Sequence, residues 1–273
     1  MAALHGLNDE TMKRCIFCNL DCSGVRRAKE HIIPDHLQRK YGLPKERLSN
    51  AHSKIVSGDF SGGHISKLPA ERELTYSGFL AGRVCKVCNN GWMSELEKEV
   101  IPLIYQLIDG EMGLDQIKQK ERESLARWSF KTTAALSSST NAPQNFVSES
   151  HSKEFYSSGG VTIPENVGVF AATSDEANFL WSFSPTWQVR TDSDIPKELL
   201  QFMQRKSYKV FLQLGHLMLA VCWWPINTIT YTLESWAGTE LSGLKNLDIN
   251  NEDCRKYFDK ENESFLMAIG AQV

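Results

Sequence analysis

Two C-x-x-C pairs stand far apart in the sequence, at Cys15–Cys18 and at Cys85–Cys88. A C-x-x-C turn places both sulfurs on one side of a tight loop, and two such turns supply the four thiolates that a tetrahedral Zn²⁺ binds at about 2.3 Å. The pairs therefore predict one structural zinc ion per chain, bound across a gap of 66 residues. Two unrelated pairs of redox-active or buried cysteines are the alternative.

The other cysteines carry less information. Cys22 lies close enough to the first pair to compete with it as a ligand, whereas Cys222 and Cys254 are expected to be ordinary apolar or surface residues. The total of seven is odd, and the first residues lack the charged and then apolar segments of a signal peptide. We therefore expect free thiols and a reducing, cytoplasmic location.

Polar residues that suit phosphodiester chemistry accompany the cysteine pairs. The segment Lys29-Glu30-His31-Ile32-Ile33-Pro34 stands between them, and Asn89-Asn90-Gly91-Trp92 directly follows the second. Phosphodiester hydrolysis needs an activated water and a stabilised leaving oxygen, which a histidine base and a Mg²⁺ ion on oxygen ligands can supply. The alternative is that Glu30 and His31 form an ordinary pair at the edge of a strand.

Charge is distributed unevenly along the chain. Residues 11–90 hold 14 Lys and Arg against 7 Asp and Glu, a net charge of +7, whereas the rest of the chain carries −10. This asymmetry predicts that the N-terminal third binds a polyanion such as DNA. The expected phosphate contacts are the basic residues that flank the cysteine pairs, namely Arg26, Arg27, Lys29, Arg83 and Lys86.

Periodicity in the sequence predicts an α+β protein. Apolar spacing predicts helices over 92–107 and 115–136, and a shorter helix over 37–48 that Gly42 and Pro44 break. Alternation predicts a strand over 73–84 and, after a loop, several strands from 167 onward. The apolar run 208–224 is too polar to span a membrane and is interpreted as two antiparallel strands joined by a turn at Leu214-Gly215-His216.

The resulting plan has three parts. Residues 11–97 form a small loop-rich module, 98–140 form connecting helices, and 141–273 form an α+β body dominated by an antiparallel sheet. Ser57–Gly63 is expected to be a turn, and Asp248–Phe265 shows weak helical spacing.

The ordered motifs C-x-x-C, E-H-I-I-P and C-x-x-C-N resemble the zinc-knuckle branch of the HNH endonucleases, whose nuclease unit is a ββα-metal fold. The resemblance covers roughly residues 15–97, and the run VCKVCNNGWMSELE is especially similar to bacterial proteins of this type. Trp128-Ser-Phe-Lys131-Thr132 is similar to a W-x-x-K-T helix that such proteins tend to carry downstream. The N-terminal module is thus expected to be a zinc-stapled ββα-metal module.

The resemblance also implies roles for individual residues. His31 is the general base, and Glu30 and Asn89 are ligands of one catalytic Mg²⁺ or Mn²⁺ ion. Asn90 is the alternative to Asn89. Glu97 could reach the site from two turns further on, but we expect it to lie on a solvated helix face, and we expect His36 at the surface rather than among the ligands.

Two features depart from the family pattern. A second metal-binding side chain usually stands one turn into the helix, but that register falls on Trp92 or Met93 here. The middle Asn of the motif has no clear counterpart, and Asn50 is the best candidate.

The sequence therefore predicts a metal-dependent DNA endonuclease, by analogy in bacterial or phage-related defence. The C-terminal body would select substrate, sense a signal or form a homo-oligomer, and no membrane partner is expected. A noncatalytic zinc-knuckle protein that binds nucleic acid is the alternative, and a protein-interaction scaffold is a third reading. The sequence does not distinguish DNA from RNA as the substrate.

Overall fold

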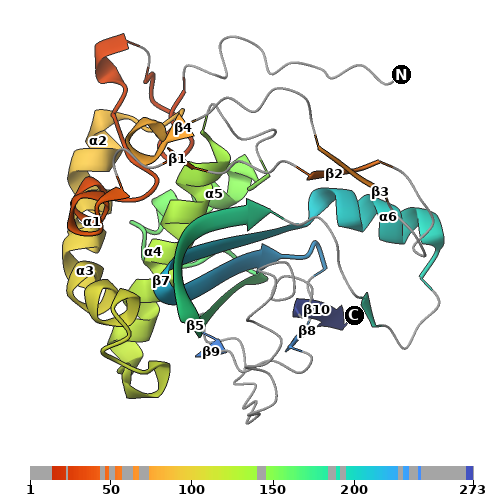
Figure 1. Cartoon of the computed structure of the whole chain (residues 1–273). Coiled ribbons are helices and arrows are strands. Elements are labelled where there is room, and N and C mark those ends of the chain that lie inside the picture. Colours follow the sequence, from red (N-terminus) through yellow and green to blue (C-terminus); the bar gives the residue numbers. More distant parts are fainter. Residues whose placement is uncertain are drawn as a thin grey trace.

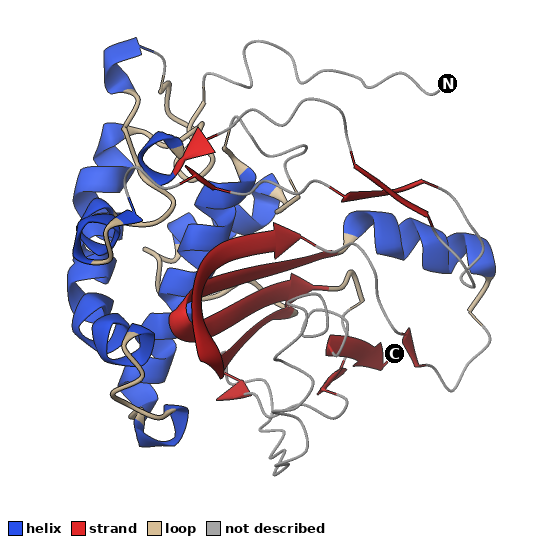
Figure 2. Ribbon diagram, viewed as in Figure 1, coloured by secondary structure: helices blue, strands red, loops and turns tan. Residues whose placement is uncertain are grey.

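The computed structural model describes residues 14–22, 24–43, 47–48, 53–56, 64–67, 74–139, 146–183, 189–190, 195–226, 230–233, 239–240 and 269–272. The turn predicted at Ser57–Gly63 and the weakly helical segment Asp248–Phe265 lie outside these residues. Helices and antiparallel strands both occur within them (Figure 2), which confirms the α+β class.

Two long helices adjoin the large sheet on one side. Helix α3 spans Ser94–Ile108 and α4 spans Gln119–Ser137, close to the helices predicted from apolar spacing. They contact each other and strand β7, on the left of the sheet in Figure 1. Helix α4 begins where the Glu121 carboxylate accepts a hydrogen bond from the backbone N–H of Lys118 at 2.9 Å. Because nearly every residue of its second half is buried, α4 is a core helix.

The shorter helices surround this pair. Helix α1 spans Asp35–Lys40, α2 spans Lys86–Cys88, α5 spans Glu149–Ser157 and α6 spans Lys197–Lys206. Short 3₁₀ turns, η2, η4 and η6, cover Gly24–Arg26, Tyr76–Gly78 and Leu114–Gln116. Helix α1 is shorter than predicted, because the chain leaves it at Gly42, whose φ of +71° favours glycine. Helix α5 was not predicted.

The large sheet is built on two long antiparallel strands. Strand β5 spans Val167–Phe183 and pairs with β7, Tyr208–Trp223, while β9, Thr239–Glu240, pairs with the other edge of β5. Shorter pairs join β1 (Arg47–Leu48) to β4 (Leu74–Thr75) and β2 (Ser53–Val56) to β3 (His64–Lys67). Strand β10 (Ile269–Gln272) lies between β6 (Val189–Arg190) and β8 (Thr230–Leu233).

The hairpin predicted around Gly215 is wrong, because β7 continues through this residue as one strand. Gly215 has a φ of +58°, and a β-carbon there would lie 2.5 Å from the backbone oxygen of Ile108. The glycine therefore permits a local irregularity and the close approach of α3, rather than a chain reversal. The pairing register of β5 shifts at the same level, between Thr173 and Asn178.

Buried apolar residues from all three predicted parts form one continuous core. It includes Phe17 and Leu37 from the N-terminal segments, Leu125 from α4 and Val169 from β5. Among the described helices, none combines the length and the apolar character that crossing a lipid bilayer requires.

Helix α5 docks on β7 through a buried histidine. His151, which is 8% exposed, shares a hydrogen bond of 3.1 Å with the Tyr208 hydroxyl, and its ring packs edge-on against Trp223 at 4.6 Å. Burial lowers the pKa of His151 from 6.5 to about 4. The folded protein therefore favours the neutral imidazole.

This histidine should make stability depend on pH. Because its pKa is lower in the folded state, the unfolded chain binds the proton more tightly between pH 6.5 and 4. The contribution to stability is complete above about pH 6.5 and falls as the pH drops toward 4, by about 2 kcal/mol between pH 7.5 and 5. In His151→Gln, urea unfolding at both pH values should show a pH dependence smaller by about this amount. Equal pH dependence in the two proteins would contradict the assignment.

Candidate metal centre

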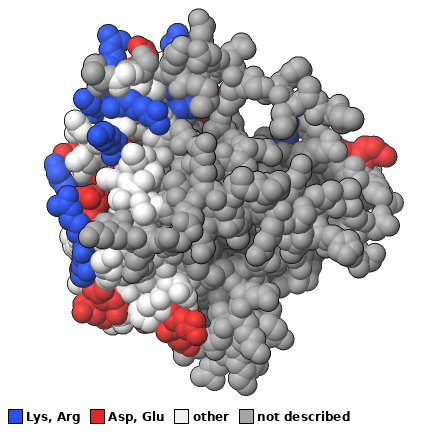
Figure 3. Space-filling model, turned by 45° about the horizontal axis from the view of Figure 1, so that its top comes forward, with Lys and Arg blue, Asp and Glu red and all other residues white. Residues whose placement is uncertain are grey.

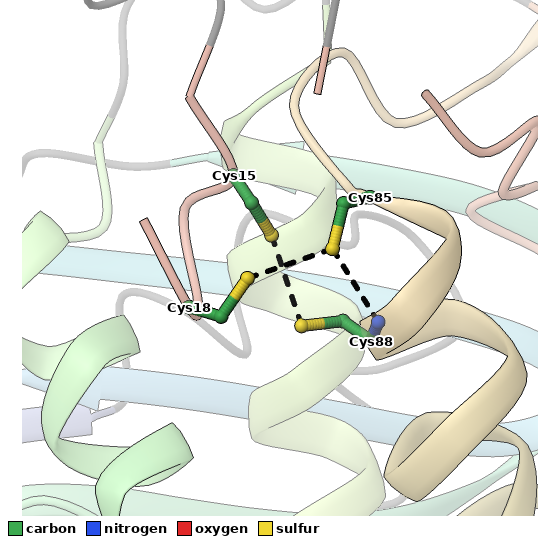
Figure 4. A group of neighbouring side chains, drawn as sticks. All are labelled: Cys15, Cys18, Cys85 and Cys88. Carbon is green, nitrogen blue, oxygen red and sulfur yellow. Dashed lines mark hydrogen bonds between the residues drawn. The ribbon is translucent and has the colours of Figure 1, made fainter. Parts of the chain in front are cut away.

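Four cysteine side chains converge in the N-terminal part of the described chain (Figure 4). The sulfurs of Cys15, Cys18, Cys85 and Cys88 all lie within 4.8 Å of one another. Those of Cys15 and Cys88 are 3.8 Å apart, and those of Cys18 and Cys85 are 3.5 Å apart. Four sulfurs at about 2.3 Å from one tetrahedral ion lie about 3.8 Å apart. The residues therefore fit a metal ion such as zinc.

The first cysteine pair lies in a tight turn. The backbone N–H of Cys15 donates to the carbonyl of Leu20 at 2.9 Å, and Arg14 pairs with Asp21 as an isolated antiparallel bridge. Asn19 takes a φ of +61°, a left-handed conformation that asparagine adopts more readily than most residues. These bonds close the loop and direct both sulfurs to one side.

The second cysteine pair starts a helix. Cys85 is the N-cap of α2, and its sulfur accepts a hydrogen bond from the backbone N–H of Cys88 at 3.4 Å. The N–H of Ile16 also donates to the carbonyl of Arg83 at 3.0 Å, so that backbone bonds hold the two turns side by side.

Proton binding in the cluster is uneven. The Cys88 side chain holds the pKa of Cys15 at about 5, whereas burial raises the pKa of Cys18 to about 11. The pKa of Cys88 is also raised, chiefly by its neighbour Cys15. Cysteines bind a metal ion as thiolates, so metal binding releases protons from the thiols and metal affinity should increase with pH.

Two extended segments pair immediately before the second cysteine pair. Arg27 pairs with Cys85 and His31 with Leu80 as antiparallel bridges, and the N–H of Ala81 donates to the carbonyl of Glu30 at 2.8 Å. The predicted strand over 73–84 is thus interrupted, because η4 stands between β4 and this paired segment. Helix α2, an irregular turn at Asn89–Met93 and α3 follow one another directly along the chain, with a kink at Gly91.

The proposed catalytic residues differ in their surroundings. Glu30 is 9% exposed and points toward α4, while His31 is partly buried. Asn89 is partly buried, and its amide donates to the side chain of Asn90 at 3.3 Å. Among the described residues, no hydrogen bond joins His31 to Glu30 or to Asn89. Asn50 lies outside the described residues.

A buried group of charges surrounds Glu30. Lys131 of α4, which is 1% exposed, places its ammonium 2.6 Å from Oε1 of Glu97 and 3.4 Å from Oε1 of Glu30. Burial favours a lower pKa for Lys131, but the two carboxylates outweigh it and raise that pKa. Burial raises the pKa of Glu30. The charge of Lys131 opposes this shift, and the charge of Glu97 adds to it.

One expectation about this region is therefore wrong. Glu97 does not lie on a solvated helix face but faces Lys131. His36 is partly exposed: its ring packs against Tyr105 with the ring centroids 5.9 Å apart, and its Nε2 is buried without a hydrogen-bond partner among the described residues. Burial lowers the pKa of His36 although the charge of Glu97 opposes the shift.

Sequence reasoning noted the motif that contains Lys131 but gave this lysine no role. The signal was available, because Lys131 follows Trp128 by three residues and precedes Ala135 by four, and both of these are buried on α4. A lysine on the apolar side of a helix requires buried acidic partners. The position of Lys131 therefore predicts a carboxylate close to it in the fold.

Basic side chains gather at the end of the molecule that holds η2, α1 and α2 (Figure 3). Arg26, Arg27, Lys29 and Lys86 are exposed there, and Arg26 makes an exposed ion pair with Asp21 at 3.3 Å. The assignment of Arg83 as a phosphate contact is wrong. Its side chain is 2% exposed, pairs with Glu149 at 2.6 Å and donates to the carbonyl of Arg14, so it is a structural link to α5.

Comparisons with protein-family models, with curated proteins and with solved structures find no match for this chain.

The sulfur geometry predicts that the purified protein contains one Zn²⁺ per chain. Cys88→Ser should lose the metal and destabilise the N-terminal segments, because the backbone bonds and apolar contacts between the two turns would offset only part of their conformational entropy. Elemental analysis and near-UV circular dichroism would measure both effects. Cys22→Ala is the matched control, since Cys22 is also buried but stands outside the cluster. Full zinc content in Cys88→Ser, or none in the wild type, would contradict the assignment.

Proposed function

We propose that this protein is a metal-dependent endonuclease of the HNH type that hydrolyses phosphodiester bonds of DNA. One observation carries the proposal. The extended segment with Glu30 and His31 pairs antiparallel with the segment entering Cys85, and a helical stretch that contains Asn89 follows at once. This order of two paired segments and a helix is the order of a ββα-metal unit, and it supports the family resemblance of the motifs.

In this proposal each residue has a defined task. His31 takes a proton from the attacking water, for which an imidazole is suited near neutral pH. Glu30 and Asn89 hold the catalytic ion through oxygen atoms, and the ion, Mg²⁺ or Mn²⁺, would stabilise negative charge on the phosphate and the leaving oxygen. A site with two protein ligands and several waters suits Mg²⁺, which dehydrates reluctantly.

The four-cysteine cluster serves this site by fixing the backbone. We assign it one structural Zn²⁺, bound where the second extended segment meets the helix. Without that link, nothing in the pairing of two short segments would hold His31 and Asn89 in a constant relation. The ion therefore acts through position and not through chemistry at the phosphate.

A noncatalytic nucleic-acid-binding protein is the second candidate. It is favoured by the engagement of Glu30 with Lys131 and by the lack of a hydrogen bond between His31 and Asn89 in the described residues. It would use the same cysteine cluster and the same basic surface, but it would not need His31. The two candidates therefore differ in what happens when His31 is replaced.

His31→Ala should abolish most cleavage and leave DNA binding nearly unchanged. A positioned base contributes about 10²–10⁴-fold to a rate, whereas its removal costs no phosphate contact. The measurement is the nicking rate of supercoiled plasmid with Mn²⁺, together with DNA affinity by fluorescence anisotropy. His216→Ala on β7 is the matched control, because this partly buried histidine lies in the sheet. Nicking by His31→Ala at the wild-type rate would refute the catalytic role.

Binding should depend on the exposed basic residues near the cysteine cluster. Exchanging Arg27 and Lys29 for Glu should weaken DNA binding and flatten its dependence on salt, since each lost phosphate contact removes about 0.9 from the log–log slope. Lys118 and Lys120, exposed near the start of α4, provide the matched control pair. If the Arg27 and Lys29 double variant keeps the wild-type salt slope, as the Lys118 and Lys120 control should, these residues do not form the DNA-binding surface.

A further inference from the structure

Lys131 links three parts of the chain through one buried ammonium group. Its side chain leaves α4 beside Trp128 and is 1% exposed. The ammonium lies 2.6 Å from the Glu97 carboxylate of α3 and 3.4 Å from the Glu30 carboxylate of the extended segment. Because Glu30 stands 101 residues before Lys131, this contact is purely tertiary.

The two contacts of the Lys131 ammonium restrain one oxygen of the Glu30 carboxylate. The shorter one anchors the ammonium to Glu97, and the longer one presents the same charge to Oε1 of Glu30. Among the described residues, no hydrogen bond engages Oε2 of Glu30. One oxygen of this carboxylate is thus held by the protein, and the other is left for a further ligand.

We propose that Lys131 is a positioning residue of the nuclease site, which orients the Glu30 carboxylate to bind the catalytic metal ion. The inference rests on the proposed function, because it needs Glu30 to be a metal ligand. Glu97 takes part by fixing the ammonium. The W-x-x-K-T segment of α4, far from the cysteine motifs in sequence, then belongs to the nuclease site in function.

The alternative roles of Lys131 make different predictions. If the lysine only stabilised the fold, its loss would lower stability and leave the metal affinity of the folded protein unchanged. If the ammonium only competed with the metal for Glu30, its loss would strengthen metal binding. A positioning residue predicts weaker metal binding, because two buried carboxylates without the ammonium between them repel each other and lose their fixed orientation.

The test is a Mn²⁺ titration of zinc-loaded protein, followed by electron paramagnetic resonance and by plasmid nicking. Lys131→Met should raise the half-saturating Mn²⁺ concentration at least about tenfold in both measurements, a typical cost of losing a group that orients a metal ligand. Zinc content should stay at one per chain. Lys131→Gln keeps an N–H donor for Glu30, so its half-saturating Mn²⁺ concentration should lie between those of the wild type and Lys131→Met. This variant replaces Lys131→Met in the comparison if the Met variant does not fold.

Lys209→Met is the matched control. Lys209 is a fully buried lysine of β7, far along the chain from the cysteine motifs, and burial lowers its pKa to about 8. Its replacement should alter stability but not the half-saturating Mn²⁺ concentration. An unchanged or lower Mn²⁺ requirement in Lys131→Met and Lys131→Gln would overturn the positioning role and leave the nuclease proposal intact. A wild-type protein that neither binds Mn²⁺ nor nicks DNA would overturn both.

Discussion

The convergence of four sulfurs is the constraint on which the N-terminal half of the structure depends. Cys15 and Cys18 stand in one tight turn, and Cys85 and Cys88 stand at the start of a helix, with 66 residues between the two pairs. Closing so long a loop is entropically costly, and the short paired segments inside it offer few bonds in return. A metal ion bound to all four sulfurs would offset that cost and would give the paired segments fixed partners.

Electrostatics provide a second, internal link. The ammonium of Lys131 joins carboxylates from the extended segment and from α3, while Arg83 joins the second cysteine turn to Glu149 of α5. Each of these cations is almost fully buried, so each pair is sensitive to loss of one partner, which would leave a buried charge uncompensated. The second cysteine turn, the extended segment and the helices are therefore linked through buried charge as well as through the apolar core.

Local sequence patterns predicted the parts of this protein that depend on local physics. The four cysteine ligands follow from ligand type and spacing, and α3 and α4 follow from apolar periodicity. Features set by distant partners were missed. The sequence around Gly215 is typical of a turn, but the role of this glycine depends on the approach of Ile108 from α3. The position of Arg83 in the sequence predicts a phosphate contact, but its side chain is buried in an ion pair with Glu149. Spacing in sequence contains no information on which distant carboxylate meets a given cation.

The central claim is that these elements form a metal-dependent nuclease. It is tested most directly with zinc-loaded wild-type protein and supercoiled plasmid, incubated with and without added Mg²⁺ or Mn²⁺. The account predicts that nicked circular DNA forms only when the divalent ion is added, because the structural site alone supplies no chemistry at the phosphate. Plasmid that stays supercoiled in the presence of either ion, although the protein is folded and binds DNA, would contradict the account and favour the noncatalytic binding protein.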